Sequence, residues 1–316
     1  YDNEELSEYK NKAKWKIANF HYQNNQYYKN KIGSIFPDKW EDLPIMGKTD
    51  FQESKNILSD GYNSKNVYYS WTSGSSGTPF YFAKSKYAHA MTWAMIDYYY
   101  KLHGISYNAK QARIFGLPNT NMFLKIKEKC KDFIMNRHRF PVQSMKEYDL
   151  DGYLKTFKMK KFRFIYGYAN ALKHFAIYIK EKKTTLKSIC PSLKLCISTA
   201  EVLTEENIKI IQSAFGVPIV NEYGTSESGV VSFGNSNKMI ISNQSLNVEV
   251  IKSKNLFGDE NAGKIVITDY FNEAMPFVRY DLGDIVSLDN TNVSNKKTYY
   301  INKIFGREND MVLLEN

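Results

Sequence analysis

Apolar residues near the start of the chain follow the period of an α-helix. They recur every three or four positions, at Leu6, Tyr9, Ala13, Ile17 and Phe20. This spacing places the five side chains on one face. We therefore expect an amphipathic helix through about the first thirty residues.

Short apolar runs alternate with helical patterns through the next part of the chain. Runs rich in β-branched and aromatic residues predict strands at 67–71, 80–83, 113–117, 162–166, 193–197 and 217–220. Thr204 is expected to cap a helix that Gly216 ends in a left-handed conformation. Repeated strand–helix alternation predicts an α/β layered fold with largely parallel strands.

A further helix is expected after Ser85, which is a suitable N-cap residue. Its buried side is expected to carry Ala88, Met91, Met95, Tyr98 and Leu102.

The pattern changes after residue 229. Short β runs follow at 230–233, 239–241, 248–251, 264–267 and 284–288, with turn residues between them. No long helical period remains in this part. We expect a small antiparallel sheet or barrel here, and a domain boundary near residue 229.

Composition narrows the class of protein. Hydrophobic residues make up 43% and charged residues 24% of the 316 residues, which excludes general disorder. No apolar stretch approaches the roughly 18–20 residues that span a bilayer, so no membrane span is expected. The three cysteines form no Cys-x-x-Cys pair. This argues against a disulfide framework or a cysteine zinc site, and favours a cytoplasmic location.

The charge leaves several partners open. The 43 Lys and Arg residues exceed the 33 Asp and Glu residues, giving a net charge of +10. Basic residues cluster at 125–139 and 155–163. Such runs usually form a solvated helix face, and they also suit a phosphate-rich ligand or an anionic polymer.

A run of small and hydroxyl residues between two predicted strands is the first candidate site. Its glycines free the backbone to turn N–H groups toward a bound anion, and its hydroxyls add donors for phosphate oxygens. Judged by composition alone, a hairpin turn or a flexible linker remains open. The run consists of Thr72, Ser73, Gly74, Ser75, Ser76, Gly77 and Thr78, followed by Pro79.

Three further motifs follow. The first comes after a predicted strand, where open α/β sheets place their ligands. Its aromatic ring offers a flat face for a base. It also contains hydroxyl groups, and a carboxylate that could hold magnesium. It contains Glu222, Tyr223, Gly224, Thr225, Ser226 and Glu227. Asp284, after Gly283, can accept hydrogen bonds from ribose hydroxyls. Arg307 follows Gly306 near the end of the sequence. Each motif alone also suits a surface turn.

In this order, the four motifs resemble those of the adenylate-forming superfamily of acyl-CoA synthetases and adenylation domains. The resemblance implies that 72–78 is the phosphate loop and that Ala200 and Glu201 lie beside the adenine. It assigns Ser226 to a phosphate contact, Glu227 to magnesium, and Asp284 and Arg307 to the ribose. Ser226 and Glu227 are thus the expected catalytic residues. Residues 1–229 are then the nucleotide- and acyl-binding part, 230–305 a small β subdomain and 306–316 a hinge.

Within the superfamily, the chain is most similar to the phenylacetate–CoA ligase-like branch, which includes capsule-biosynthesis homologues. Residues 25–28, 166–170 and 275–280 carry this similarity. The pattern at 281–283 departs from phenylacetate ligases, so their substrate is not carried over. The resemblance implies an acyl pocket that contains His89, Trp93, Tyr166, Gly167, Tyr168 and Ala200.

The implied reaction joins a small carboxylic acid to the α-phosphate of ATP, with Mg²⁺, and passes the acyl group to CoA or an amine. The family's catalytic lysine follows the hinge at Asp310, and no residue here aligns with it. We therefore expect the 316-residue chain alone to be poorly active. A basic module that binds glycan or nucleic acid would explain the charge but not the motifs, and no Gly-x-Ser-x-Gly supports a serine hydrolase. The acid, the acceptor and the oligomeric state stay undecided.

Overall fold

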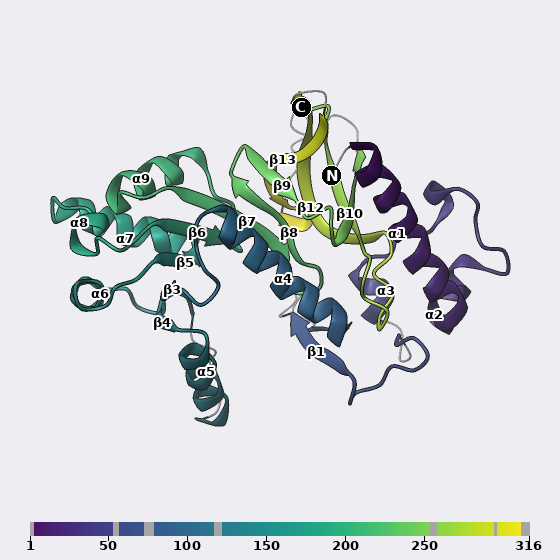
Figure 1. Cartoon of the computed structure of the whole chain (residues 1–316), viewed down its shortest axis with the longest axis horizontal. Helices are drawn as coiled ribbons and strands as arrows, with labels where there is room; N and C mark the ends of the chain where they lie inside the picture. Colours follow the sequence, from purple (N-terminus) through teal and green to yellow (C-terminus); the bar gives the residue numbers. More distant parts are fainter. Residues whose placement is uncertain are drawn as a thin grey trace. The chain divides into compact units, whose positions relative to one another are not determined.

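The computed structural model describes residues 3–52, 57–72, 79–116, 122–252, 258–293 and 296–310 (Figure 1). The chain forms two compact units. The first comprises Tyr1–Met95, Gly224–Ser232 and Asn237–Asn316, and the second comprises Ile96–Tyr223 and Phe233–Ser236. These divisions differ from the predicted boundary near residue 229. Among the described residues, no helix is long and apolar enough to cross a membrane.

The second unit contains a parallel sheet with strand order β7-β6-β5-β3-β4. Its strands are β3 (Gln111–Ile114), β4 (Arg137–Phe140), β5 (Phe164–Tyr168), β6 (Leu195–Thr199) and β7 (Ile219–Thr225). Its helices are α5 (Met122–Ile134), α6 (Glu147–Met159), α7 (Ala169–Glu181), α8 (Leu186–Ile189) and α9 (Glu205–Phe215). The predicted α/β class with parallel strands is confirmed.

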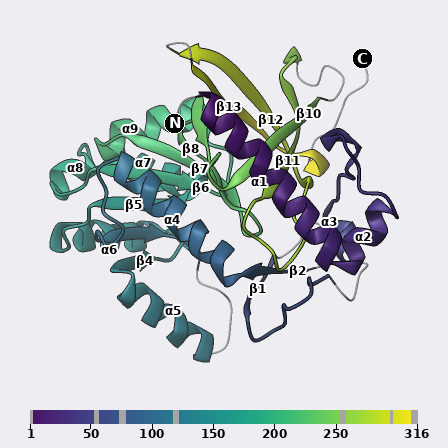
Figure 2. The same cartoon turned by 45° about the vertical axis from the view of Figure 1, so that its right-hand side comes forward.

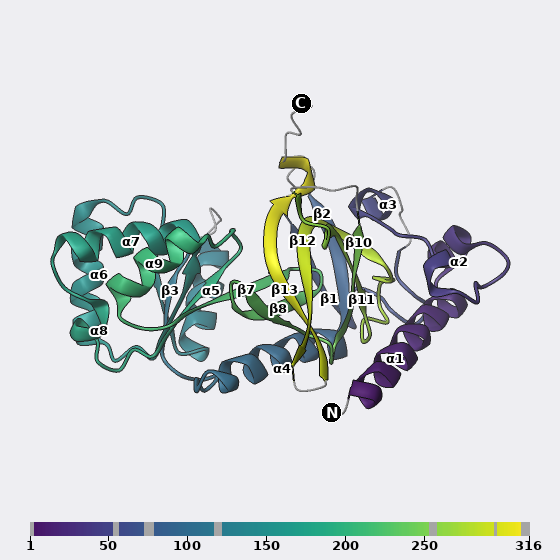
Figure 3. The same ribbon diagram turned by 90° about the horizontal axis from the view of Figure 1, so that it is seen from above.

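One face of this sheet forms the hydrophobic core of the unit. Ala112, Ile165 and Cys196 are fully buried and belong to one cluster with side chains of α6, α7 and α9. Helix α7 packs on α9 (Figure 3). It also contacts β5 and β6. Because side chains alternate between faces along a strand, Arg113 and Tyr166 point to the opposite face. That face therefore carries polar groups.

The first unit combines helices with antiparallel strands. Strands β1 (Val67–Thr72) and β2 (Phe80–Ser85) form a separate pair, and the remaining strands follow the order β10-β11-β12-β13-β9-β8. Figure 2 shows α1 beside this sheet, and α1 contacts β11. The strands are β8 (Gly229–Asn235), β9 (Lys238–Ile241), β10 (Leu246–Lys252), β11 (Ala262–Asp269), β12 (Tyr280–Val293) and β13 (Lys296–Arg307); the helical segments are α1 (Asn3–Asn24), α2 (Gln26–Ile32), η1 (Trp40–Asp42), α3 (Lys48–Gln52) and η3 (Glu308–Asp310).

The predicted N-terminal helix is two helices. Asn25 lies between α1 and α2 and is 2% exposed. Its Oδ1 accepts a hydrogen bond from the backbone N–H of Tyr28 at 2.9 Å, so it caps α2. The apolar period continues through the break, which is why the sequence pattern did not reveal it.

Helix α4 (Lys86–Leu102) begins where predicted, because the backbone N–H of Ala88 donates to Ser85 Oγ at 3.1 Å. The buried side predicted for its C-terminal half is wrong. Tyr98 and Leu102 are 44% and 54% exposed, whereas Tyr99 is 1% exposed and stacks on Phe233. Three consecutive tyrosines precede Leu102. Hydrophobicity alone cannot choose among adjacent residues of the same type.

Strands β4 and β13 were not predicted. β4 reads Arg137-His138-Arg139-Phe140, which has the composition of a solvated segment. Its ladder with β3 and ion pairs of both arginines hold it in the sheet. Tertiary pairing here overrides the local signal.

Candidate nucleotide and acid site

The predicted phosphate loop joins two adjacent antiparallel strands. Thr72 ends β1 and pairs with Phe80 at the start of β2. Ser73 to Thr78 lie outside the described residues. The hydroxyl of Thr72 is buried, and no partner for it is present in the described part of the chain. The flanking strands agree with the sequence analysis, and the role of the loop stays a prediction.

The second motif forms the tight connection from β7 to β8. Thr225 Oγ1 lies 2.9 Å from Ser228 Oγ and accepts the backbone N–H of Ser228 at 3.1 Å. A Cβ on Gly224 would stand 2.2 Å from the carbonyl oxygen of Gly229, so the close backbone approach requires glycine. Ser226 is exposed and Glu227 is buried. The turn is thus rigid and presents the Ser226 side chain to solvent.

A buried cation accompanies Glu227 in the first unit. Lys84, from β2, is 2% exposed, and its Nζ donates to Thr92 Oγ1 at 3.2 Å. Burial lowers the pKa of Lys84, and the carboxylates of Asp269 and Glu227 oppose that shift. Burial likewise raises the pKa of Asp269, which the Lys84 charge opposes. The position of Lys84 directly after the apolar run 80–83, at the end of a predicted strand, is the sequence signal that could have indicated it.

The donor groups near Glu227 suit magnesium only together with a phosphate ligand. The described residues contain no group of three His, Cys, Asp or Glu side chains arranged to hold a metal. Magnesium commonly takes one or two carboxylates and completes its shell with phosphate oxygens and waters. One carboxylate from Glu227 fits that pattern, whereas a permanently bound structural metal would need more ligands.

The third and fourth motifs meet on neighbouring strands of the first unit. Asp284 and Arg307 are register partners on β12 and β13, and Arg307 Nε lies 3.1 Å from Asp284 Oδ1. Gly283 has φ of +72°, which favours glycine directly before Asp284. Arg279, from the same motif, is structural, because its guanidinium donates to the carbonyls of Glu41 and Leu43 at 2.7 and 2.6 Å.

In the second unit, one hydrogen bond joins residues from two predicted groups. Tyr166 from the predicted acyl pocket donates its hydroxyl to Glu222 Oε1 at 2.7 Å. Burial raises the pKa of Glu222, while the hydrogen bond from Tyr166 and the charge of Arg113 oppose the shift. Thr199 Oγ1 donates to the carbonyl of Glu222 at 3.1 Å. Side chains of β5 and β6 therefore both hydrogen-bond to Glu222 on β7, one to its carboxylate and the other to its backbone carbonyl.

Other predicted residues of the second unit have structural constraints of their own. A Cβ on Gly167 would lie 2.8 Å from the carbonyl oxygen of Ile114, so the β3–β5 approach requires glycine. Ala200 is exposed and has φ of +65°. Glu201 accepts the backbone N–H of Asn170 at 2.7 Å, at the start of α7. Tyr223 is partly buried at the end of this unit's share of β7.

His89 and Trp93 lie on α4 within the first unit. Trp93 Nε1 is 3.2 Å from His89 Nε2, and Tyr68 stacks on the imidazole with ring centroids 4.0 Å apart. Burial lowers the pKa of His89, and the nearby Lys84 charge lowers it further. The imidazole is therefore neutral at pH 7. Tyr168, by contrast, lies in the second unit and packs on Phe115, with ring centroids 3.9 Å apart.

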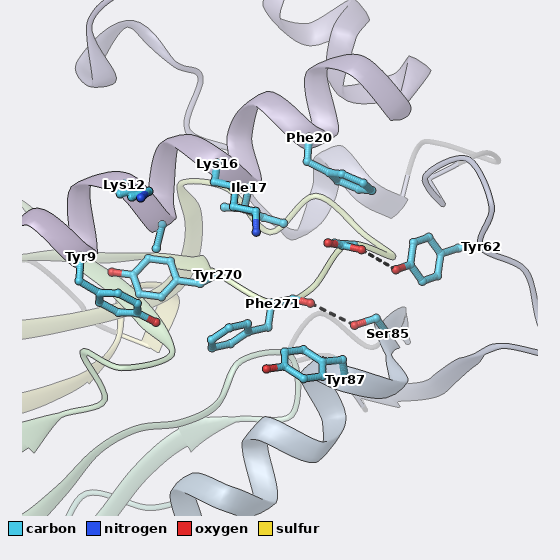
Figure 4. Close-up of a pocket in the computed structure, with 12 residues that line it drawn as sticks. Tyr9, Lys12, Lys16, Ile17, Phe20, Tyr62, Ser85, Tyr87, Tyr270 and Phe271 are labelled. Atoms are coloured by element: carbon cyan, nitrogen blue, oxygen red, sulfur yellow. Dashed lines mark hydrogen bonds between the residues drawn. The ribbon is translucent and has the colours of Figure 1, made fainter.

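A separate cavity of about 620 Å³ lies in the first unit beside α1 (Figure 4). Aromatic rings and the aliphatic parts of α1 side chains form most of its wall. Tyr62 donates to Glu273 at 2.8 Å at one end, and Lys16 reaches in from α1. None of the residues predicted for the nucleotide or the acid lines this cavity.

Comparisons with known proteins bear on the fold. The chain matches no family model. It is 26% identical to Protein CapK of Staphylococcus aureus, over 98% of this chain and 69% of that protein. An open conformation of 2-hydroxyisobutyryl-CoA ligase in complex with 2-HIB-AMP and CoA is similar with a TM-score of 0.71, at 17% identity, over 99% of this chain and 76% of the ligase.

A second solved structure is similar to the chain over a smaller part of its length. ATP-bound MatB from Rhodopseudomonas palustris is similar with a TM-score of 0.54, at 12% identity, over 80% of this chain and 50% of MatB. These similarities confirm the predicted resemblance to the adenylate-forming superfamily at the level of the fold. The chain therefore has the fold of the adenylate-forming CoA ligases.

Proposed function

We propose that this protein activates a small carboxylic acid by forming an acyl-adenylate from ATP and releasing pyrophosphate. The order of the four motifs on this fold is the observation that carries the proposal. The acyl group then passes to CoA or to an amine or another acceptor. Two similar proteins support the nucleotide part, because one is a ligase in complex with 2-HIB-AMP and CoA and the other is bound to ATP.

In this proposal, residues of the chain bind the nucleotide and orient it. Asp284 accepts hydrogen bonds from the ribose hydroxyls. Arg307 orients the Asp284 carboxylate through the ion pair between Arg307 Nε and Asp284 Oδ1, which are 3.1 Å apart. Ser226, exposed on a rigid turn, donates to a phosphate oxygen. Glu227 would hold magnesium together with the phosphates, and the metal would neutralise charge that develops on them.

An AMP titration by calorimetry tests the ribose contact. Asp284→Ala should weaken AMP affinity by about 1–3 kcal/mol, the scale of hydrogen bonds to a charged group. Asp289→Ala, on the same strand, is the matched control and should leave AMP affinity unchanged. Unchanged AMP affinity in Asp284→Ala would remove this residue from the site.

A kinetic comparison tests Glu227. In the full-length gene product, Glu227→Gln should depress the rate of pyrophosphate release more than the affinity for ATP, because the metal acts mainly as charge develops. Equal losses in rate and affinity would make Glu227 a binding residue only. Thermal unfolding of the same variant controls for disturbance of the neighbouring Lys84.

A further inference from the structure

Three arginines of the second unit lie on neighbouring strands at the polar face of the sheet. Arg113 on β3 and Arg139 on β4 are register partners, and Arg137 stands two residues before Arg139 on the same face. Arg139 pairs with Asp132 and Glu128 at 3.0 Å, and Arg137 pairs with Asp132 at 2.5 Å. Two of the three charges are therefore neutralised by α5.

Arg113 is the exception. Its guanidinium makes no hydrogen bond or ion pair with any residue that the structure describes, and its Nε is buried. Its carbon Cζ lies 4.2 Å from the ring centre of Phe115 and 4.8 Å from that of Tyr166. The two rings are nearly parallel, with centroids 5.7 Å apart. Stacking fixes the plane of the guanidinium and leaves its in-plane N–H groups for a partner.

Glu222 is the carboxylate that feels the charge of Arg113, but no salt bridge joins the two side chains. Glu222 directs Oε1 to the Tyr166 hydroxyl, and burial raises the pKa of Glu222 toward the neutral form. Burial also lowers the pKa of Arg113, as do the charges of Arg137 and Arg139. A desolvated cation without an anion is costly, and such groups concentrate at binding sites.

We propose that Arg113 binds a second anionic group of the acid substrate, so that the cognate acid carries one carboxylate for adenylation and a further anion at its other end. This inference rests on the proposed function, because it places Arg113 beside Tyr166 of the predicted acyl pocket. A planar guanidinium recognises a carboxylate or a phosphate through two parallel hydrogen bonds. A hydrocarbon acid would leave the charge of Arg113 partly buried and without an ion-pair partner among the described residues.

Binding of the acids alone tests the inference without requiring catalysis. Malonate, succinate, glutarate and adipate would each be compared with the monocarboxylate of equal carbon number by ligand-observed NMR titration. The unmodified chain should bind at least one dicarboxylate about 10–100-fold more tightly than its matched monocarboxylate. Arg113→Met should remove that preference, and Arg113→Lys should keep part of it.

Controls separate a specific site from the general positive charge. Arg163→Met removes a cation directly before β5 and should keep the full preference. Circular dichroism and thermal unfolding check that Arg113→Met is folded. No preference for a dicarboxylate of any length, or a preference that survives Arg113→Met, would overturn the inference. A phosphate-terminated acid that binds in place of the dicarboxylates, and loses binding in Arg113→Met, would identify phosphate as the second anion.

The proposed function can fail separately. If dicarboxylates bind through Arg113 but no acid supports pyrophosphate exchange with ATP by the full-length gene product, the assignment of Arg113 stands and adenylation is wrong. If exchange occurs with monocarboxylates only and is indifferent to Arg113→Met, adenylation stands and the assignment of Arg113 is wrong.

Discussion

Each compact unit contains a basic side chain that is withdrawn from solvent, Lys84 fully and Arg113 in part, and the two differ in what surrounds the charge. Lys84 in the first unit donates to Thr92 and lies in the field of Asp269 and Glu227. Arg113 in the second unit is stacked on two aromatic rings and has no ion-pair partner among the described residues. Removing one member of a compensated buried pair destabilises the fold, whereas an uncompensated charge is better explained by a ligand.

Removal of the compensated cation should have the largest effect. Lys84→Met leaves Asp269 buried without its nearby positive charge, so we expect the free energy of unfolding to fall by about 3 kcal/mol, measured with urea. Lys86→Met, at an exposed neighbouring position, is the matched control. Lys84→Met combined with Asp269→Asn should recover part of the loss. A single Lys84→Met variant as stable as the unmodified chain would show that these charges are not coupled.

A further basic side chain, His21, is buried in its neutral form. His21 is fully buried, with Nδ1 3.0 Å from Ser59 Oγ and Nε2 3.0 Å from the carbonyl of Asn272. Burial lowers its pKa to about 3. Below pH 6.5 the unfolded chain therefore takes up a proton that the folded chain does not. Stability from this group is complete above pH 6.5 and declines toward pH 3.

Urea unfolding at several pH values measures the contribution of His21 to the free energy of unfolding. Between pH 6.5 and 4.5 the free energy of unfolding should fall by about 3 kcal/mol because of His21, at roughly 1.4 kcal/mol per pH unit. Other groups titrate in this range as well, so this contribution is the difference between the unmodified chain and His21→Gln. His174→Gln should retain the full slope. Identical slopes for the unmodified chain and His21→Gln would mean that His21 is not held neutral.

The smallest effect on stability is expected at Arg113. Because its charge is unpaired, Arg113→Met should change the free energy of unfolding by no more than about 1 kcal/mol, as lost stacking is offset by relief of desolvation. The variant should nevertheless lose selectivity for the acid. A loss of stability as large as that of Lys84→Met would show that Arg113 has a structural partner, and would contradict the contrast between the two units.

Periodic patterns gave much of the architecture. The parallel strands β3, β5, β6 and β7, and the capped helix that ends at Gly216, could be predicted because each carries a local signal. β4 could not, because its pairing with β3 and its ion pairs to α5 depend on residues distant in sequence. The buried side of α4 failed for a related reason, since adjacent tyrosines have the same hydrophobicity.

In the candidate site, too, some residues could be predicted from the sequence and others could not. The motifs that contain Glu227 and Asp284 were visible as ordered sequence runs, and the structure pairs Asp284 with Arg307. Lys84 ends an apolar run and Arg113 lies within one, and the sequence alone does not tell whether such a residue turns outward. The fold decides both cases: Lys84 is buried beside Thr92, Asp269 and Glu227, whereas Arg113 is partly buried and has no ion-pair partner among the described residues.

The most direct test of the central claim is exchange of labelled pyrophosphate into ATP by the full-length gene product across a panel of carboxylic acids. Adenylation predicts exchange that depends on an added acid, and the assignment of Arg113 predicts that acids with a second anionic group support it best. Loss of one preorganised charge-stabilising group typically costs about 10²–10³ in rate, so Glu227→Gln should slow exchange on that scale. Exchange that no acid raises above the acid-free background would contradict the proposed function.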